Sequence, residues 1–222
     1  VYTLGIDSGS TSTNAVILDE NRQIKAFSVV RTGAKSSQSA DAALADVLKK
    51  AGLDREDISL IVSTGYGRVS IPFADKNVTE ISCHGKGAHL LFPDVHTILD
   101  IGGQDSKAIR LNDNGEVADF VMNDKCAAGT GRFLEMMART MEMSLDDMGK
   151  AGLSYKEDIT ISSMCTVFAE SEVVSLIAQN KATDDIVHGL NKAVASKTAA
   201  LAKRVGGEER YMMTGGVSKN QG

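Results

Sequence analysis

Apolar and polar positions divide the chain into two series of strands and helices that follow the same order. Apolar residues in short runs or strict alternation predict strands, and apolar residues at helical spacing predict helices. In the first series, the predicted strands are 2–7, 14–18 and 24–30, and 58–68 is a strand that runs into a Gly-rich loop. The predicted helices are 39–53 and 79–92. In the second series, the predicted strands are 97–101, 106–111 and 117–122, and the predicted helices are 126–143, 165–178 and 184–205. The repeated order predicts an α/β chain made of two related halves, 1–95 and 96–222.

The helical patterns differ in how their apolar residues are arranged. In the segment 126–143, the apolar residues that share one helix face are Phe133, Leu134, Met137, Ala138 and Met141. In the segment 165–178, the apolar residues are Val167, Phe168, Val174 and Ile177. The segment 39–53 carries Gly52 near its end, which is a typical helix stop.

Each half begins with the same kind of turn. The first lies in LGIDSGSTSTNAVIL (4–18) and the second in ILDIGGQDSKAIRL (98–111). Both have an apolar run, an Asp, one residue, a Gly, a small polar turn and a second apolar run. A Gly-rich turn exposes backbone N–H groups and lets a phosphate approach without a Cβ in the way. Two such turns facing each other would clamp one nucleotide in the cleft between the halves.

A tight hairpin without a ligand would explain either turn alone. A third Gly-rich strand end, at 214–216, makes the nucleotide interpretation the better one. The candidate nucleotide-binding residues are Asp7, Gly9, Ser10, Thr11, Ser12, Thr13, Asp100, Gly102, Gly103, Gln104, Gly215, Gly216 and Val217. No Gly-Lys-Ser/Thr occurs, so the pattern is not a Walker A loop.

Four polar side chains at the two main turns suit the chemistry of ATP hydrolysis. Asp7 and Asp100 each end a strand, where a carboxylate can hold Mg²⁺ directly or through water. Hydrolysis needs an oriented water and neutralised phosphate charge. Gln104 and Asp105 stand next to the second turn and are the candidates to position the attacking water, Gln104 above all.

Two further motifs resemble a known family. MNDKCAAGTGRFLE (122–135) and SSMCTVFAESEV (162–173), together with the turns, resemble the activators of 2-hydroxyacyl-CoA dehydratases and the ATPase subunits of benzoyl-CoA reductases. The resemblance covers essentially the whole chain. It implies the fold of the acetate and sugar kinase, heat-shock chaperone and actin superfamily, in which two ribonuclease-H-like halves hold ATP in the cleft. Because 210–222 predicts a strand, a turn and only the start of a helix, we expect the family's C-terminal portion, which completes the adenine pocket, to be missing.

One position departs from the family's pattern. Many relatives carry a Lys after the first turn, where this chain has Asn14. Asn keeps a hydrogen-bond donor but has no positive charge. The substitution puts a direct Lys–phosphate contact in doubt at this turn, but leaves the backbone cradle unaffected.

Cys126 and Cys165 are the candidate metal ligands. Each stands where a helix is predicted to begin, and a helix N-terminus lowers the pKa of a thiol. Thiolates there suit an iron–sulfur cluster, which usually takes four cysteines, so a two-fold dimer would supply the full set. The family resemblance implies this 4Fe–4S cluster shared between two identical subunits. The alternative is that both are small buried side chains, which is also the expectation for Cys83; His84 beside it is expected to be structural or a surface contact.

Composition excludes several classes of function. The net charge is −5, with 24 basic and 29 acidic residues interleaved, so no polybasic surface for nucleic acid or membrane is predicted. No secretory signal pattern and no apolar run of the roughly 20 residues that span a bilayer is present. Three widely spaced cysteines fit a reducing compartment. We therefore expect a soluble cytoplasmic protein.

The family resemblance implies an ATP-dependent one-electron donor. Such a protein accepts an electron from ferredoxin or flavodoxin and passes it at low potential to a 2-hydroxyacyl-CoA dehydratase or a related reductase. Lys125 and Arg132 flank the first cysteine motif; they could dock an acidic partner or simply be solvated charges. The alternatives are a small-molecule kinase of the same superfold and a non-redox nucleotide sensor.

Overall fold

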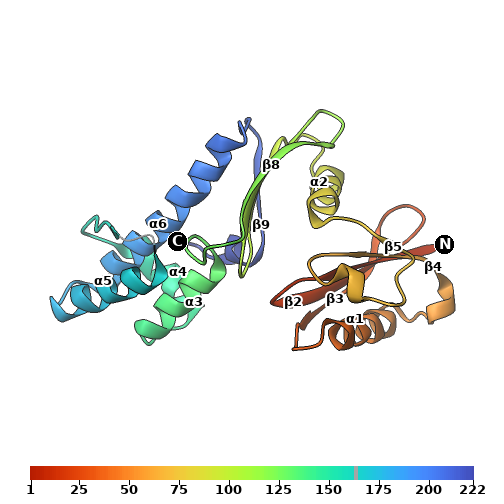
Figure 1. The fold of residues 1–222 in the computed structure, drawn as a ribbon, viewed down its shortest axis with the longest axis horizontal. Coiled ribbons are helices and arrows are strands. Elements are labelled where there is room, and N and C mark those ends of the chain that lie inside the picture. Colours follow the sequence, from red (N-terminus) through yellow and green to blue (C-terminus); the bar gives the residue numbers. More distant parts are fainter. Residues whose placement is uncertain (163–164) are drawn as a thin grey trace. The chain divides into compact units, whose positions relative to one another are not determined.

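The computed structural model describes residues 1–162 and 165–222, so Ser163 and Met164 of the second cysteine motif lie outside the described residues. The chain divides into two compact units, Val1–His84 and Gly85–Gly222, each built around one β-sheet (Figure 1). Helix α2 (Glu80–Leu91) crosses this division. The division after residue 95 that the sequence suggests stays a prediction.

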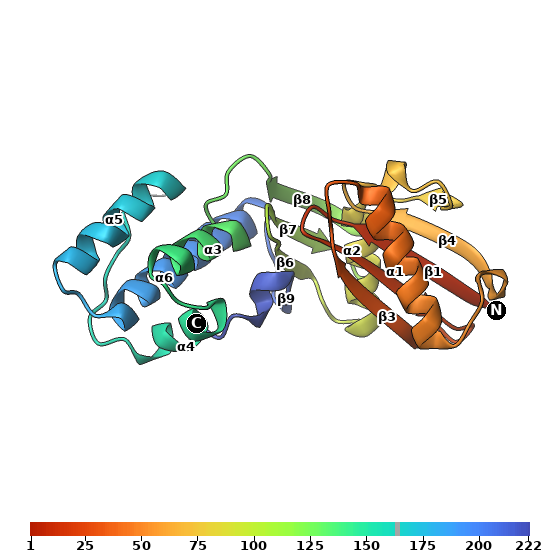
Figure 2. The same ribbon diagram turned by 90° about the horizontal axis from the view of Figure 1, so that it is seen from below.

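The first unit is a five-stranded sheet with a helix on one face. The strand order is β3-β2-β1-β4-β5, with bounds β1 Tyr2–Ser8, β2 Ser12–Leu18, β3 Ile24–Arg31, β4 Ile58–Thr64 and β5 Lys76–Asn77. Strand β1 pairs antiparallel with β2 and parallel with β4. Helix α1 (Ser36–Ala51) lies along the sheet (Figure 2) and buries Val47 against Leu4, Ile6 and Ile17. It ends at Gly52, whose φ of 67° is the left-handed conformation that the predicted stop requires.

The second unit repeats the same strand arrangement. Its sheet has the order β8-β7-β6-β9, with bounds β6 Thr97–Ile101, β7 Ser106–Leu111, β8 Val117–Asn123 and β9 Tyr211–Thr214. Strand β6 pairs antiparallel with β7 and parallel with β9, as β1 does with β2 and β4. The predicted repetition of a strand, a turn and a returning strand is therefore confirmed in both units.

Four α-helices accompany the second sheet: α3 Gly131–Thr140, α4 Leu145–Ala151, α5 Thr166–Ala178 and α6 Thr183–Arg204. Helix α6 packs Leu201 on the sheet residue Ala108. The predicted apolar face of α3 forms a core with α4, α5 and α6, and Met137 at its centre has no exposed surface. Short 3₁₀ turns complete the chain: Arg55–Asp57, Arg68–Ser70, Gly152–Ser154 and Gly216–Lys219.

Two sequence expectations about these helices were wrong. The helix predicted at 126–143 begins only at Gly131, because residues 124–130 form a loop that the Asn123 side chain holds by donating to the carbonyls of Cys126 (2.9 Å) and Ala128 (3.2 Å). Helix α4 was missed, although Ser144 caps it by accepting from the Asp147 N–H, a start signal that the sequence contains.

Helix α5 begins and ends close to its predicted bounds, but its apolar residues are not where a core helix would have them. Val167, Phe168, Val174 and Ile177 are 43–66% exposed. The buried residues of α5 are Thr166, Ala169 and Val173, and the partly buried Leu176 packs against the same core.

None of the helices in the described part of the chain combines the length and the apolar character that a membrane span requires.

Candidate nucleotide site and cysteine positions

The first turn places Asp7 between two polar neighbours. Asp7 stands at the end of β1, in register with Asn14 of β2 and Thr64 of β4. The Asn14 Nδ2 donates to Asp7 Oδ2 at 3.4 Å. Thr64 Oγ1 is buried and finds no hydrogen-bond partner among the described residues. Gly65 follows with φ of 84°, and a Cβ there would collide with Asp7 Oδ1.

The polar residues of the first turn divide into an open tip and a buried support. The Gly9 N–H donates to the Ser12 carbonyl at 3.0 Å and closes the turn, which leaves Ser10 and Thr11 exposed at its tip. Thr13 is fully buried, and its hydroxyl is hydrogen-bonded to that of Thr32 at 2.9 Å. Ser10, Thr11 and Ser12 therefore offer groups to a ligand, whereas Thr13 holds the turn from behind.

The second turn has the same backbone with different side chains. Asp100 ends β6, in register with Lys107 of β7 and Thr214 of β9. The Gly102 N–H donates to the Asp105 carbonyl at 2.9 Å, which matches the bond that closes the first turn. The Thr214 hydroxyl donates to Asp100 Oδ1 at 3.0 Å. Gln104 is exposed at the tip of this turn.

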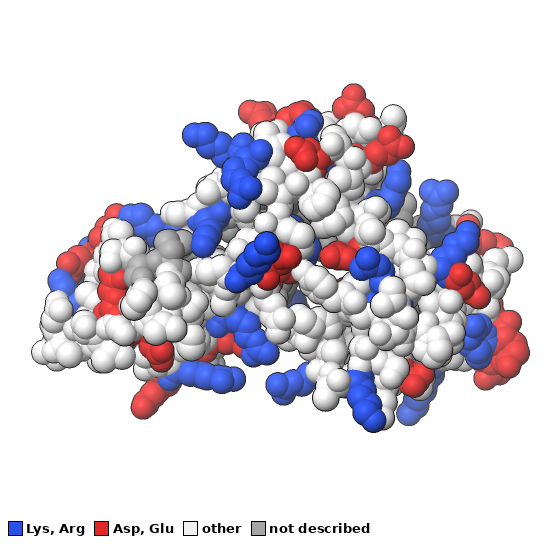
Figure 3. Space-filling view, viewed as in Figure 1, with Lys and Arg blue, Asp and Glu red and all other residues white. Residues whose placement is uncertain are grey.

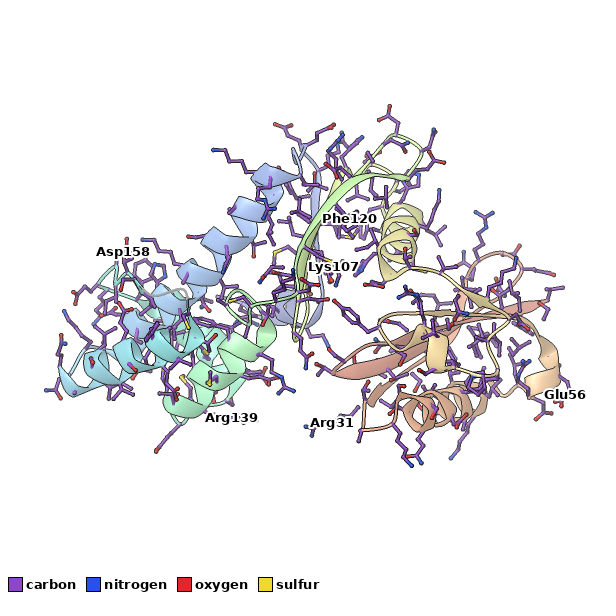
Figure 4. The ribbon with its side chains drawn as sticks, in the orientation of Figure 1. Arg31, Glu56, Lys107, Phe120, Arg139 and Asp158 are labelled. Carbon is purple, nitrogen blue, oxygen red and sulfur yellow. The ribbon has the colours of Figure 1, made fainter. Side chains whose placement is uncertain are left out.

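Lys107 is a residue of this site that the sequence patterns do not single out. Its side chain is 5% exposed, and Nζ donates to Asp105 Oδ2 at 2.7 Å and to Asp100 Oδ2 at 3.4 Å. Figure 4 labels Lys107 in the second unit. Burial by itself lowers the pKa of Lys107, but hydrogen bonding and charge attraction from Asp105 and Asp100 outweigh it and leave the pKa above the ordinary value. The ammonium group is therefore charged at neutral pH.

The third Gly-rich strand end completes the second turn. Gly215 follows Thr214 with φ of 84°, the value found at Gly65, and a Cβ there would collide with the Ile101 carbonyl. The side chain of Val217 packs with the core of the α-helices. The structure thus brings the candidates Asp100, Gly102, Asp105 and Gly215 together at one end of the second sheet.

Helix α3 begins directly on the second turn. The Gly131 N–H donates to the Gly102 carbonyl at 2.8 Å, and the Arg132 N–H donates to the Gly103 carbonyl at 2.9 Å. A Cβ at Gly131 would lie 3.2 Å from the Gly102 oxygen, so the small residue permits the close approach. The cysteine loop at 124–130 leads straight into this helix.

The two candidate cysteines lie in different settings. Cys165 is the exposed N-cap of α5, as predicted. Cys126 is partly exposed in the loop before α3, so the expectation that it starts a helix is wrong. Neither thiol forms a disulfide. Cys83, expected in the core, is partly exposed as well.

Cys126 and Cys165 are the candidate cluster ligands in this chain. Across the described residues, no group of three or more His, Cys, Asp or Glu side chains is placed to hold a metal ion. Two accessible thiols per chain fit a group whose remaining ligands come from elsewhere. Arg132, six residues after Cys126 in the sequence, pairs with Glu135 at 2.8 Å. Figure 3 shows basic and acidic side chains interspersed on the face in view.

Comparisons with known proteins cover nearly all of the chain. The model of the BadF/BadG/BcrA/BcrD ATPase family matches residues 4–222. The activator of lactoyl-CoA dehydratase from Anaerotignum propionicum is 51% identical over 222 residues, which are 100% of this chain and 85% of the relative.

Two solved structures share the fold. Component A of (R)-2-hydroxyglutaryl-CoA dehydratase from Acidaminococcus fermentans matches with a TM-score of 0.95 and 45% identity, over 99% of this chain and 85% of that one. The activator of 2-hydroxyisocaproyl-CoA dehydratase from Clostridium difficile, with bound ADPNP, matches with a TM-score of 0.93 and 43% identity, over 100% and 82%. The actin-like ATPase fold expected from the sequence is confirmed.

Proposed function

The chain belongs to the BadF/BadG/BcrA/BcrD ATPase family, and we propose that it is an ATP-dependent one-electron donor that activates a 2-hydroxyacyl-CoA dehydratase or a related reductase. The observation that carries the proposal is the direct attachment of α3, which follows the cysteine loop, to the second turn. Relatives named as dehydratase activators support the choice of partner. A structure of one of them with ADPNP supports ATP as the nucleotide.

The two Gly-rich turns are the proposed phosphate-binding elements. Their Gly-rich backbone and the exposed Ser10 and Thr11 offer donors to phosphate oxygens. Gly215, Gly216 and Val217, which follow β9 of the second unit, are the third proposed element. Exposed polar residues at the turns, Ser10 and Thr11 in the first unit and Gln104 in the second, support the proposal of a bound nucleotide.

Mg²⁺ fits the carboxylates that end β1 and β6, and it would neutralise phosphate charge when bound. Asp7 and Asp100 are the proposed ligands, directly or through water. Gln104, exposed at the tip of the second turn, is the proposed orienter of the attacking water. Asp105, on the same turn, is the second residue proposed to position this water.

Cys126 and Cys165 are the proposed ligands of a 4Fe–4S cluster, which would supply one-electron transfer. Two thiols per chain require a second copy of the chain, so we propose a homodimer with two-fold symmetry. Three free thiols among the described residues fit a reducing compartment, so we place the protein in the cytoplasm, with ferredoxin or flavodoxin as the electron donor.

The path from nucleotide to thiol is short in this chain. A change at the second turn moves the carbonyls of Gly102 and Gly103, which anchor the first N–H groups of α3. Helix α3 packs against α5, and the Thr140 hydroxyl of α3 donates to Glu170 of α5 at 3.1 Å. Both cysteine-bearing segments can therefore respond to the state of one turn.

Anaerobic iron and sulfide analysis of the purified protein tests the redox part of the proposal. We expect about four irons per two chains in the wild type, and loss of most of the iron in both Cys126→Ser and Cys165→Ser. Cys83→Ser is the matched control and should keep its iron. An iron-free protein after anaerobic reconstitution would leave an ATPase without a redox function, and phosphotransfer to a small molecule would favour the kinase alternative.

A further inference from the structure

Lys107 lies where a lysine is costly to keep. A buried ammonium loses its hydration, and the loss is offset only by close, well-oriented carboxylates. Lys107 has two of them, Asp105 at 2.7 Å and Asp100 at 3.4 Å. All three side chains are at most 11% exposed. The cluster stands at the proposed phosphate site, where two carboxylates without a cation would repel each other and the phosphates.

A comparison of the two repeated turns shows which residue of the second turn is paired with Lys107. Asn14 occupies the register position in the first turn that Lys107 occupies in the second, opposite Asp7 and Asp100 respectively. In the first turn the Gly9 N–H donates to the Ser12 carbonyl, and in the second the Gly102 N–H donates to the Asp105 carbonyl. Ser12 and Asp105 therefore occupy corresponding positions as well.

The hairpin therefore forms with either pair of side chains, Ser12 with Asn14 or Asp105 with Lys107. Because the first turn keeps the same closing bond and the same Asp-to-donor contact without a lysine, Lys107 is not needed to form the turn. The second turn has a charged acceptor, Asp105, and a charged donor, Lys107, where the first turn has two neutral residues. Lys107 is thus matched to Asp105 rather than to the backbone of the hairpin.

We propose that Lys107 is a positioning residue for ATP hydrolysis, acting through the Asp105 carboxylate to fix the turn that carries Gln104. The inference rests on the proposed function. The Asp105 carbonyl closes the turn onto Gly102, so a held Asp105 fixes both ends of the segment that presents Gln104. The same segment anchors the start of α3.

A double-mutant cycle tests the coupling. The proteins are the wild type, Lys107→Met, Asp105→Asn and the double variant, with the ATP hydrolysis rate, the KM for ATP and the affinity for a fluorescent ADP measured on each. We expect Lys107→Met to lower kcat by about tenfold to hundredfold, as for a misplaced catalytic group. The double variant should fall within about threefold of the poorer single variant, because the two residues act as one unit. Lys107→Arg should recover part of the rate.

Lys192→Met is the matched control, since Lys192 forms an exposed pair with Asp158 at 2.7 Å in the same unit. It should leave kcat and KM unchanged. Effects of Lys107→Met and Asp105→Asn that multiply in the double variant, or an unchanged kcat in Lys107→Met, would overturn the role of Lys107 while the wild type still hydrolyses ATP. A wild type without ATP hydrolysis would instead overturn the proposed function, and the role of Lys107 with it. If Lys107→Met alone unfolds, the double variant, which lacks both charges, is compared with Asp105→Asn. We then expect the two to hydrolyse ATP at similar rates, and a much slower double variant would overturn the role of Lys107.

Discussion

At the scale of single residues, the repeated turns depend on small details of backbone and charge. Gly65 and Gly215 share the same φ of 84°, and each lies against the end of the strand that carries the aspartate of its own unit, Asp7 or Asp100. The side chains opposite these aspartates differ: a neutral amide at Asn14 and an ammonium at Lys107. The two units therefore share a backbone plan but differ in the charge of the side chain beside the aspartate.

Gly65→Ala should lower both stability and nucleotide affinity. The left-handed conformation costs a residue with a Cβ about 1–2 kcal/mol, and the new methyl group would also displace Asp7. Gly52→Ala is the control, because Gly52 has φ of 67° but a Cβ there would meet no atom within 4 Å. Thermal unfolding and ADP affinity should show a stability loss in both variants and an affinity loss only at Gly65. Equal ADP affinity in the two variants would argue against a role for Asp7.

At the scale of elements, the helices of the second unit combine packing with the presentation of the cysteines. Helix α3 buries Phe133, Leu134 and Met137, and its first N–H groups donate to carbonyls of the second Gly-rich turn. Helix α5 buries Ala169 and Val173, leaves Phe168 exposed, and follows its N-cap residue Cys165. Packing of α3 therefore supports the core and the proposed nucleotide path at the same time.

Met137→Ala should destabilise the protein by about 2–5 kcal/mol, because it removes a side chain with no exposed surface from a packed core. Chemical denaturation of the purified chain measures the loss. Arg139→Ala, an exposed change on the same helix (Figure 4), should stay within about 0.5 kcal/mol of the wild type. A small effect at Met137 would mean that the core collapses around the missing side chain.

At the scale of the whole molecule, ligand binding should appear as added stability. A ligand that binds only the folded state stabilises it by about 2.7 kcal/mol at a hundred times its Kd. We expect MgADP to raise the unfolding temperature, and EDTA to remove most of the gain because the proposed Asp7 and Asp100 ligands would lose their ion. Differential scanning calorimetry with MgADP, with ADP and EDTA, and without nucleotide checks this expectation. No shift at millimolar MgADP would contradict the proposed site.

The sequence alone determined the order of most strands and helices, the repetition of the turns and the family. These features are local: strand alternation, helical spacing and glycine positions follow from backbone geometry within a few residues. Motif letters alone were also enough to single out Asp7, Asp100, Cys126 and Cys165. The Ser144 start of α4 was a local signal that was present and not used.

Tertiary structure decided what depends on register and burial. Lys107 reads as an ordinary strand residue until the pairing of β6 with β7 sets it opposite Asp100 and its buried ammonium reaches Asp105. The Asn123 side chain binds the Cys126 carbonyl and holds the preceding loop, so the helix starts only at Gly131 and Cys126 lies in the loop. The exposure of Val174 on α5 likewise follows from which face meets α3 and α6. Each of these depends on contacts between segments far apart along the chain, and an apolar or charged letter does not specify them.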